Sequence, residues 1–180
     1  MAAQDDRMEA RWSYFQQVME SKPDARASIA GSEAYPEIRG SLILHRTAYG
    51  VLLCVQVFGL PGESDPCKNN IFAFHIHDGD ACSGNEADPF AAAGTHYNPA
   101  GCDHPNHAGD LIPLFGNNGY AFACFLTNRF EIGEVIGKTV IIHRNVDDFT
   151  SQPAGNAGEK IACGKIVSSG EKRIDNENNL

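Results

Sequence analysis

Residues 38–58 read IRGSLILHRTAYGVLLCVQVF and contain two apolar runs, Ile38–His45 and Val51–Phe58, separated by the turn signal Tyr49-Gly50. From Ala27 onward the hydrophobic period is two, which is typical of β-strands because successive side chains point to opposite faces. These runs therefore predict two strands at the centre of a β-rich domain.

The same pattern continues on both sides of this stretch. Further strands are predicted at Ala27–Gly31, Phe72–His77, Tyr120–Leu126, Thr139–His143 and Ile161–Val167. Pro61-Gly62 marks a turn, and Asn118-Gly119 between apolar runs favours a type I′ hairpin. Because no helix-length segment separates the strands, we expect an antiparallel sandwich or barrel with Greek-key connections, not a parallel α/β sheet.

The two ends of the chain differ from this domain. In residues 1–26, Met8, Trp12, Phe15 and Met19 recur at helical spacing and Pro23 closes the segment, which predicts an amphipathic helix. We expect that helix to pack on the domain surface; a partner-binding or dimer-forming helix is the alternative. The domain itself is predicted to span 27–169, and the polar tail 170–180 to be disordered.

Composition excludes some function classes. The chain has 180 residues and a formal net charge of −9, so it repels phosphate backbones and a nucleic-acid partner is not expected. The longest apolar runs are too short to span a membrane. The polar, acidic start is unlike a secretory signal, so we expect a cytoplasmic protein. The sequence is compatible with a homodimer and does not fix the oligomeric state.

Histidine is concentrated in one region. Six of the seven histidines lie within Phe72–Arg144, namely His75, His77, His96, His104, His107 and His143, and only His45 lies outside. His75 and His77 share one face of a predicted strand and can chelate one metal, although such pairs also occur by chance. His104, His107 and Asp110 offer the imidazole and carboxylate ligands that zinc takes; a solvated polar loop is the alternative. The long polar segment 78–116 around them is predicted to be functional.

The cysteines do not form a zinc-ribbon pattern, because none of the six is in a C-x2-C pair. Six cysteines allow 15 pairings, and composition does not choose among them. Cys54 and Cys124 lie inside apolar strands and are predicted to be buried thiols. Cys67 and Cys102 are candidates for a disulfide near the polar loop.

Five motifs then occur in one order along the chain: FHIH at 74–77, GTHYNP at 94–99, HAGDL at 107–111, GKTVIIH at 137–143 and GNAGEKIACG at 155–164. On these motifs the chain resembles copper/zinc superoxide dismutases, and looks closest to bacterial members, over about Ala27–Val167. The resemblance implies an all-β, immunoglobulin-like Greek-key sandwich or flattened barrel with a long metal-binding loop. It also implies an enzyme that converts superoxide to oxygen and hydrogen peroxide with copper and zinc as cofactors.

The resemblance further implies a role for each matching residue. Copper would be held by His75, His77, His96 and His143, and zinc by His96, His104, His107 and Asp110. His96 would bridge the metals and take up a proton when copper is reduced. Asp147 would tie a copper ligand to a zinc ligand, and Cys82 would form a disulfide with Cys163.

Two features depart from the family pattern. Only two residues separate His104 from His107, fewer than in many relatives, and Lys160 occupies a position where the family usually carries arginine. Lys160 is expected to attract superoxide but to orient it less well than arginine. A copper-binding or copper-buffering protein on the same fold is the alternative function. A zinc hydrolase is disfavoured, because three histidines and an aspartate leave no open zinc position.

Overall fold

A computed structural model describes residues 2–62 and 70–170, and the side chains from residue 8 onward. Along the chain the elements are α1 Ala2–Glu20, β1 Ala25–Gly31, β2 Arg39–Thr47, β3 Gly50–Phe58, β4 Ile71–Phe72, β5 Phe74–His77, η1 Ala91–Ala93, β6 Leu114–Phe115, β7 Ala121–Thr127, α2 Ile132–Val135, β8 Thr139–His143, β9 Lys160–Lys165 and β10 Val167–Ser168.

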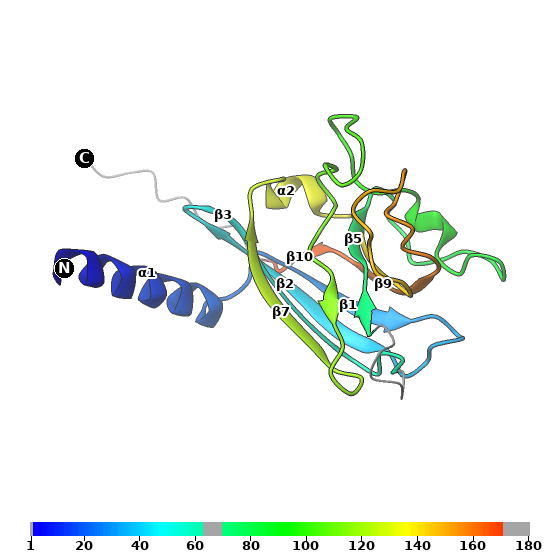
Figure 1. The fold of residues 1–180 in the computed structure, drawn as a ribbon, viewed down its shortest axis with the longest axis horizontal. Helices are drawn as coiled ribbons and strands as arrows, with labels where there is room; N and C mark the ends of the chain where they lie inside the picture. The colour runs from blue at the N-terminus through cyan, green and yellow to red at the C-terminus, as the bar shows by residue number, and fades with distance from the viewer. Residues whose placement is uncertain (1, 63–69, 171–180) are drawn as a thin grey trace.

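Most strands belong to one curled antiparallel sheet (Figure 1). Its order is β5-β8-β9-β1-β2-β3-β7, β10 pairs with β1, and β4 and β6 form a separate two-stranded sheet. Strands that are distant in sequence, such as β5 and β8 or β9 and β1, are neighbours, so the connections cross over as the predicted Greek-key architecture requires. The predicted antiparallel all-β fold is confirmed.

The sheet encloses an apolar core on its concave side. Side chains from most strands meet there, among them Leu42, Leu53, Phe74, Ile142 and Ile161, all of which are fully buried. Along β1 buried and exposed positions alternate, as the period of two predicts. The convex face of β8 and β9 is also covered, because Ile141 and Cys163 pack against Phe90 and Ala93 of the segment that follows β5.

The turn residues behave as the sequence indicates. Asn118 and Gly119 both have positive φ, at 52° and 81°, and Asn117 and Tyr120 exchange backbone hydrogen bonds around them. Gly50 begins β3 with a φ of 121°, where a side chain would collide with the carbonyl oxygen of Thr127. The Gly50 turn joins the paired strands β2 and β3, whereas the Asn118-Gly119 turn is closed by a single antiparallel bridge before β7.

The strand boundaries differ slightly from those predicted. The single strand predicted over Phe72–His77 is divided at Ala73 into β4 and β5, which belong to different sheets. Likewise the predicted strand Ile161–Val167 is interrupted after Lys165. The short β6 and α2 were not predicted, because a pair of residues or a single turn has no measurable hydrophobic period.

The N-terminal helix α1 projects away from the sheet (Figure 1). Its contact lies near its C-terminal end, where the Tyr14 hydroxyl accepts a hydrogen bond from the Ala48 amide at 2.9 Å and the Phe15 ring lies 6.0 Å from that of Tyr49. Met8 and Trp12 remain 59% and 71% exposed, so these two positions do not pack on the domain surface as expected. The reason is geometric: the helix meets the sheet only near its end.

No helix among residues 2–62 and 70–170 is long and apolar enough to cross a membrane. The predicted disordered tail lies outside the described residues, apart from Gly170.

Candidate metal centre

All seven residues proposed as metal ligands are buried and come together in two groups. The potential ligand atoms of each group lie within 4.8 Å of one another, and the groups are His75, His77, His96 and His143, and His96, His104, His107 and Asp110. His45, the histidine outside the predicted cluster, is buried in β2 and belongs to neither group.

Strand alternation places the first group on the convex face of the sheet. In β5, Phe74 and Ile76 enter the core, so His75 and His77 point to the other face. His143 ends the neighbouring strand β8, at an irregularity in its pairing with β9.

A loop segment carries the second group to the edge of β5. The Ile76 amide donates to the Gly109 carbonyl at 2.8 Å, and the Tyr97 amide donates to the Ile76 carbonyl at 2.8 Å. These bonds set His96 opposite His77 and Asp110 opposite His75. Gly109 permits the approach, because a Cβ at this position would collide with the Ile76 carbonyl oxygen. The polar loop is therefore fixed to the edge of the sheet by two isolated β-bridges.

Backbone carbonyls fix the orientation of two imidazoles. His77 Nδ1 lies 2.9 Å from the Gly94 carbonyl oxygen, and His143 Nδ1 lies 3.1 Å from that of Gly158. A carbonyl only accepts hydrogen bonds, so Nδ1 carries the proton in both rings. Their Nε2 atoms are then free of protons and lie 3.2 Å apart. Both nitrogens are available to a metal.

Asp147 joins the two groups. Its Oδ2 lies 2.8 Å from His75 Nε2 and its Oδ1 lies 2.8 Å from His104 Nε2. An ionised carboxylate accepts, so each histidine donates through Nε2 and presents an unprotonated Nδ1 to the site. Neither Nδ1 has a hydrogen-bond partner among the described residues, and His104 Nδ1 lies 3.1 Å from Asp110 Oδ2, another acceptor; buried acceptors in this arrangement are costly unless a cation is bound there.

His96 lies between the groups. Its Nδ1 is 2.7 Å from Asp110 Oδ1, while its Nε2 is buried with no hydrogen-bond partner in residues 2–62 and 70–170. The His96 ring centroid is 4.0 Å from that of His75 and 5.4 Å from that of His107. One imidazole therefore offers one nitrogen to each group.

The remaining contacts of Asp110 complete the second group. Its Oδ2 lies 3.1 Å from His104 Nδ1 and accepts from the His107 amide at 2.9 Å, and its Oδ1 is 3.3 Å from His107 Nδ1. The Nδ1 atoms of His96, His104 and His107 thus surround the Asp110 carboxylate. Three imidazole nitrogens and one carboxylate are a donor set that zinc accepts. The short spacing between His104 and His107 does not prevent this convergence.

Burial keeps His77 and His143 of the first group neutral. Burial lowers the pKa of His143 to about 3, assisted by the nearby charge of His75. Burial also lowers the pKa of His77 well below its usual value. Burial alone would raise the pKa of Asp147, but hydrogen bonds, above all the one from His75, lower it to about 2. Neutral imidazole and ionised carboxylate are the states that bind metals.

Sequence reasoning missed three supporting residues. Arg129 Nη1 donates to the carbonyls of Pro105 at 2.8 Å and His107 at 3.1 Å, and lies 3.4 Å from that of Asp110. Gln152 bonds both the amide and the carbonyl of His104, at 3.0 and 2.7 Å. These contacts hold the metal loop, and no local sequence signal identifies them.

The third is Gly155, which occurs in a motif but had no assigned role. It has a φ of 64° and packs over the Asp147–His104 bond. A Cβ there would collide with the Asp147 carboxylate and lie 2.7 Å from His104 Nε2.

A cavity of about 410 Å³ opens onto the first group, lined by His77, His96, His143 and Lys160 among others. Lys160 pairs with His143 in the β8–β9 ladder, which puts both residues at the cavity. The structure therefore places Lys160 beside the predicted copper ligands.

Four of the five cysteines in the described residues pair in two disulfides. Cys82 is bonded to Cys163, as the resemblance implied, with Cα atoms 5.6 Å apart. Cys54 is bonded to Cys124, so the prediction of buried thiols is wrong: they are directly opposite in the β3–β7 ladder. Cys102 is exposed and has no disulfide partner among the described residues; its proposed partner Cys67 lies outside them, so that pairing stays a prediction.

Comparison with known proteins agrees with this geometry. The model of a family described as copper/zinc superoxide dismutase matches residues 40–166. Superoxide dismutase [Cu-Zn] 2 of Aquifex aeolicus is 32% identical over 157 residues, covering 79% of this chain and 85% of the relative. Superoxide dismutase [Cu-Zn] of Deinococcus radiodurans is 30% identical over 161 residues, covering 79% and 84%.

Proposed function

The chain belongs to the copper/zinc superoxide dismutase family, and we propose that its two buried clusters are the metal sites through which it acts. The enzyme converts two superoxide anions and two protons to one molecule of oxygen and one of hydrogen peroxide. Copper would be held by His75, His77, His96 and His143, and zinc by His96, His104, His107 and Asp110. When bound, copper supplies one-electron chemistry, while zinc keeps a fixed charge.

The observation that carries this assignment is the position of His96. Its Nδ1 faces Asp110 and its buried Nε2 has no hydrogen-bond partner. Because His96 belongs to both ligand sets, the two clusters together suit a pair of different cations, which neither cluster would indicate by itself. His96 Nε2 is also the atom that can accept a proton whenever it is not bound to a metal, so it is suited to deliver a proton for peroxide formation.

Other groups keep the imidazoles in the tautomers that can bind a metal. Gly94 and Gly158 keep Nδ1 protonated in His77 and His143, so the Nε2 atoms need not reorganise to bind. Asp147 does the same for His75 and His104 through their Nε2 atoms. Loss of any of these acceptors would allow the wrong nitrogen to become protonated.

Lys160 is proposed to attract the substrate. Superoxide is an anion and the chain carries a net charge of −9, so a local cation must offset the general field. The Lys160 side chain lines the cavity with His143. In Lys160→Ala, turnover should fall and its dependence on ionic strength should flatten, whereas Lys160→Arg should equal or exceed the wild type. An unchanged rate and salt slope in Lys160→Ala would exclude this role.

The test of the function combines metal analysis with a superoxide assay. After saturation, elemental analysis should approach one copper and one zinc per chain, and the loaded protein should consume superoxide. Retention of two zinc ions without copper uptake would contradict the assignment. Copper uptake without turnover would favour the copper-buffering alternative.

A homodimer is a separate proposal, supported by the exposed apolar side chains of Phe122 and Leu126 on one face of β7. Light scattering should give twice the chain mass of 19.5 kDa. A mass equal to one chain would contradict it.

A further inference from the structure

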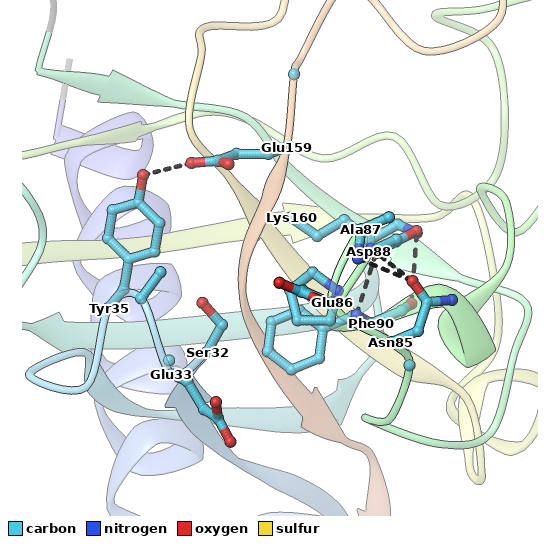
Figure 2. A pocket seen from close by; sticks show the side chains of 15 residues that line it. Ser32, Glu33, Tyr35, Asn85, Glu86, Ala87, Asp88, Phe90, Glu159 and Lys160 are labelled. Atoms are coloured by element: carbon cyan, nitrogen blue, oxygen red, sulfur yellow. Dashed lines mark hydrogen bonds and ion pairs between the residues drawn. The ribbon is translucent and has the colours of Figure 1, made fainter.

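The Lys160 ammonium group is not free at the cavity. Its Nζ lies 2.6 Å from Asp88 Oδ2 and 3.3 Å from the Phe90 carbonyl oxygen (Figure 2). The lysine side chain is only 15% exposed and that of Asp88 is 40% exposed. The cation proposed to attract superoxide therefore has a carboxylate as its direct partner.

The loop around Asp88 holds this carboxylate in place. Asp88 Oδ1 accepts from the Phe90 amide at 3.1 Å, and Asn85 Oδ1 accepts from the amides of Ala87 and Asp88 at 2.9 and 3.1 Å. The Cys82–Cys163 disulfide joins the start of the same loop to β9, the strand that carries Lys160. Lys160 thus belongs to β9, and the loop that carries Asp88 is attached to the same strand by the disulfide.

The pair lies on the boundary between two cavities. Lys160 lines the metal cavity and also a second cavity of about 950 Å³, which Asp88 and Glu159 line as well (Figure 2).

We propose that Asp88 is a positioning residue that sets the attraction of the metal cavity for anions, by fixing the Lys160 ammonium group and offsetting its charge. This inference rests on the proposed function of the cavity. An ammonium group with a carboxylate at 2.6 Å presents a dipole to an approaching anion, and the field of a dipole decays faster with distance than that of a single charge. The Lys160 ammonium group is therefore held in a fixed position, while its attraction for distant anions is weakened.

The test is Asp88→Asn, because asparagine keeps Oδ1 as the acceptor for the Phe90 amide, removes the negative charge, and places an NH₂ group that cannot accept opposite Lys160 Nζ. Azide binding to the copper-loaded protein, followed by visible absorbance, reports the attraction for anions without turnover. Removing one negative charge beside the cavity should tighten azide binding about two- to tenfold and steepen the salt dependence of superoxide consumption. Asp88→Glu should remain close to the wild type because it retains the charge.

Asp80→Asn is the matched control. Asp80 belongs to the same segment and lies 3.9 Å from Lys165, but its side chain is 83% exposed and lines neither cavity. The control changes net charge equally and should leave azide affinity unchanged. An unchanged affinity in Asp88→Asn, or an equal change in both variants, would overturn the proposal.

A metal-free measurement tests the pair independently of the proposed function. Burial tends to raise the pKa of Asp88, but the hydrogen bond from Lys160 and its charge lower it. In Lys160→Met without metals, an NMR titration should therefore show a higher Asp88 pKa than in the wild type. An unchanged value would overturn the pairing. If wild-type protein binds copper and azide but does not consume superoxide, the proposed function fails while the azide comparison still decides the role of Asp88.

Discussion

Replacing Asp147 by asparagine should weaken metal binding through the proton positions of two histidines. The Asp147 carboxylate is 2% exposed and accepts from His75 Nε2 and His104 Nε2, each at 2.8 Å. Asparagine has the same shape, but one of its two terminal groups is an amide that donates. Whichever way the amide is turned, its NH₂ faces one of the two Nε2 atoms.

That histidine must then accept through Nε2 and carry its proton on Nδ1, the atom proposed to bind metal. One site in Asp147→Asn therefore binds its metal only after breaking a buried hydrogen bond. Losses of this kind cost about 10–100-fold in affinity, or about 1.4–2.7 kcal/mol. Asp147→Ala should show a similar or larger loss, with zinc released first, because both hydrogen bonds disappear.

The assay is competition for zinc and for copper with a chromophoric chelator. Asp148→Asn is the control, because in the described part of the chain the neighbouring carboxylate accepts hydrogen bonds from Thr150 and Ser151 and from no histidine. Asp147→Asn with affinity for both metals within about twofold of the wild type would refute the tautomer argument, since even the lower bound is tenfold.

Three further outcomes follow from the surroundings of the site. In Arg129→Lys the flexible ammonium cannot replace the planar guanidinium over three carbonyls, so zinc should dissociate about tenfold faster in a stopped-flow chelator experiment. In Gly155→Ala the added methyl collides with the Asp147 carboxylate, so metal loading should fall and Tm should drop by about 2–10 °C in a thermal scan. Peptide mapping without reductant should recover Cys82 joined to Cys163, a link across 81 residues worth about 4 kcal/mol in the chain-entropy account.

Each outcome has a result that contradicts it. Gly133→Ala is the control for Gly155→Ala, because a Cβ at Gly133 meets no atom within 4 Å; equal losses in both variants would show that the collision is not the cause. An unchanged zinc dissociation rate in Arg129→Lys would show that the guanidinium does not hold the loop. A free thiol at Cys82 in the native protein would exclude the disulfide.

The sequence alone predicted the β architecture and part of the candidate ligand set, because both depend on local rules, whereas His96 and His143 were assigned only through the family resemblance. The pleat fixes the direction of each side chain along a strand, so alternation predicted that His75 and His77 share a face opposite the core side chain of Ile76. Residue type and close spacing identified His107 and Asp110 as one group, since both lie within a single turn of the loop. Their roles then came from the order of the motifs.

Only the tertiary structure decided which nitrogen of each histidine faces the site, because that depends on acceptors distant in sequence, such as the Asp147 carboxylate beside His75. The same holds for the disulfide between Cys54 and Cys124, which the register of β3 and β7 brings together. It holds again for the ion pair of Lys160 with Asp88, which are 72 residues apart. Hydrogen-bond partners and cross-strand neighbours are set by the path of the whole chain, and no local pattern in the sequence encodes them.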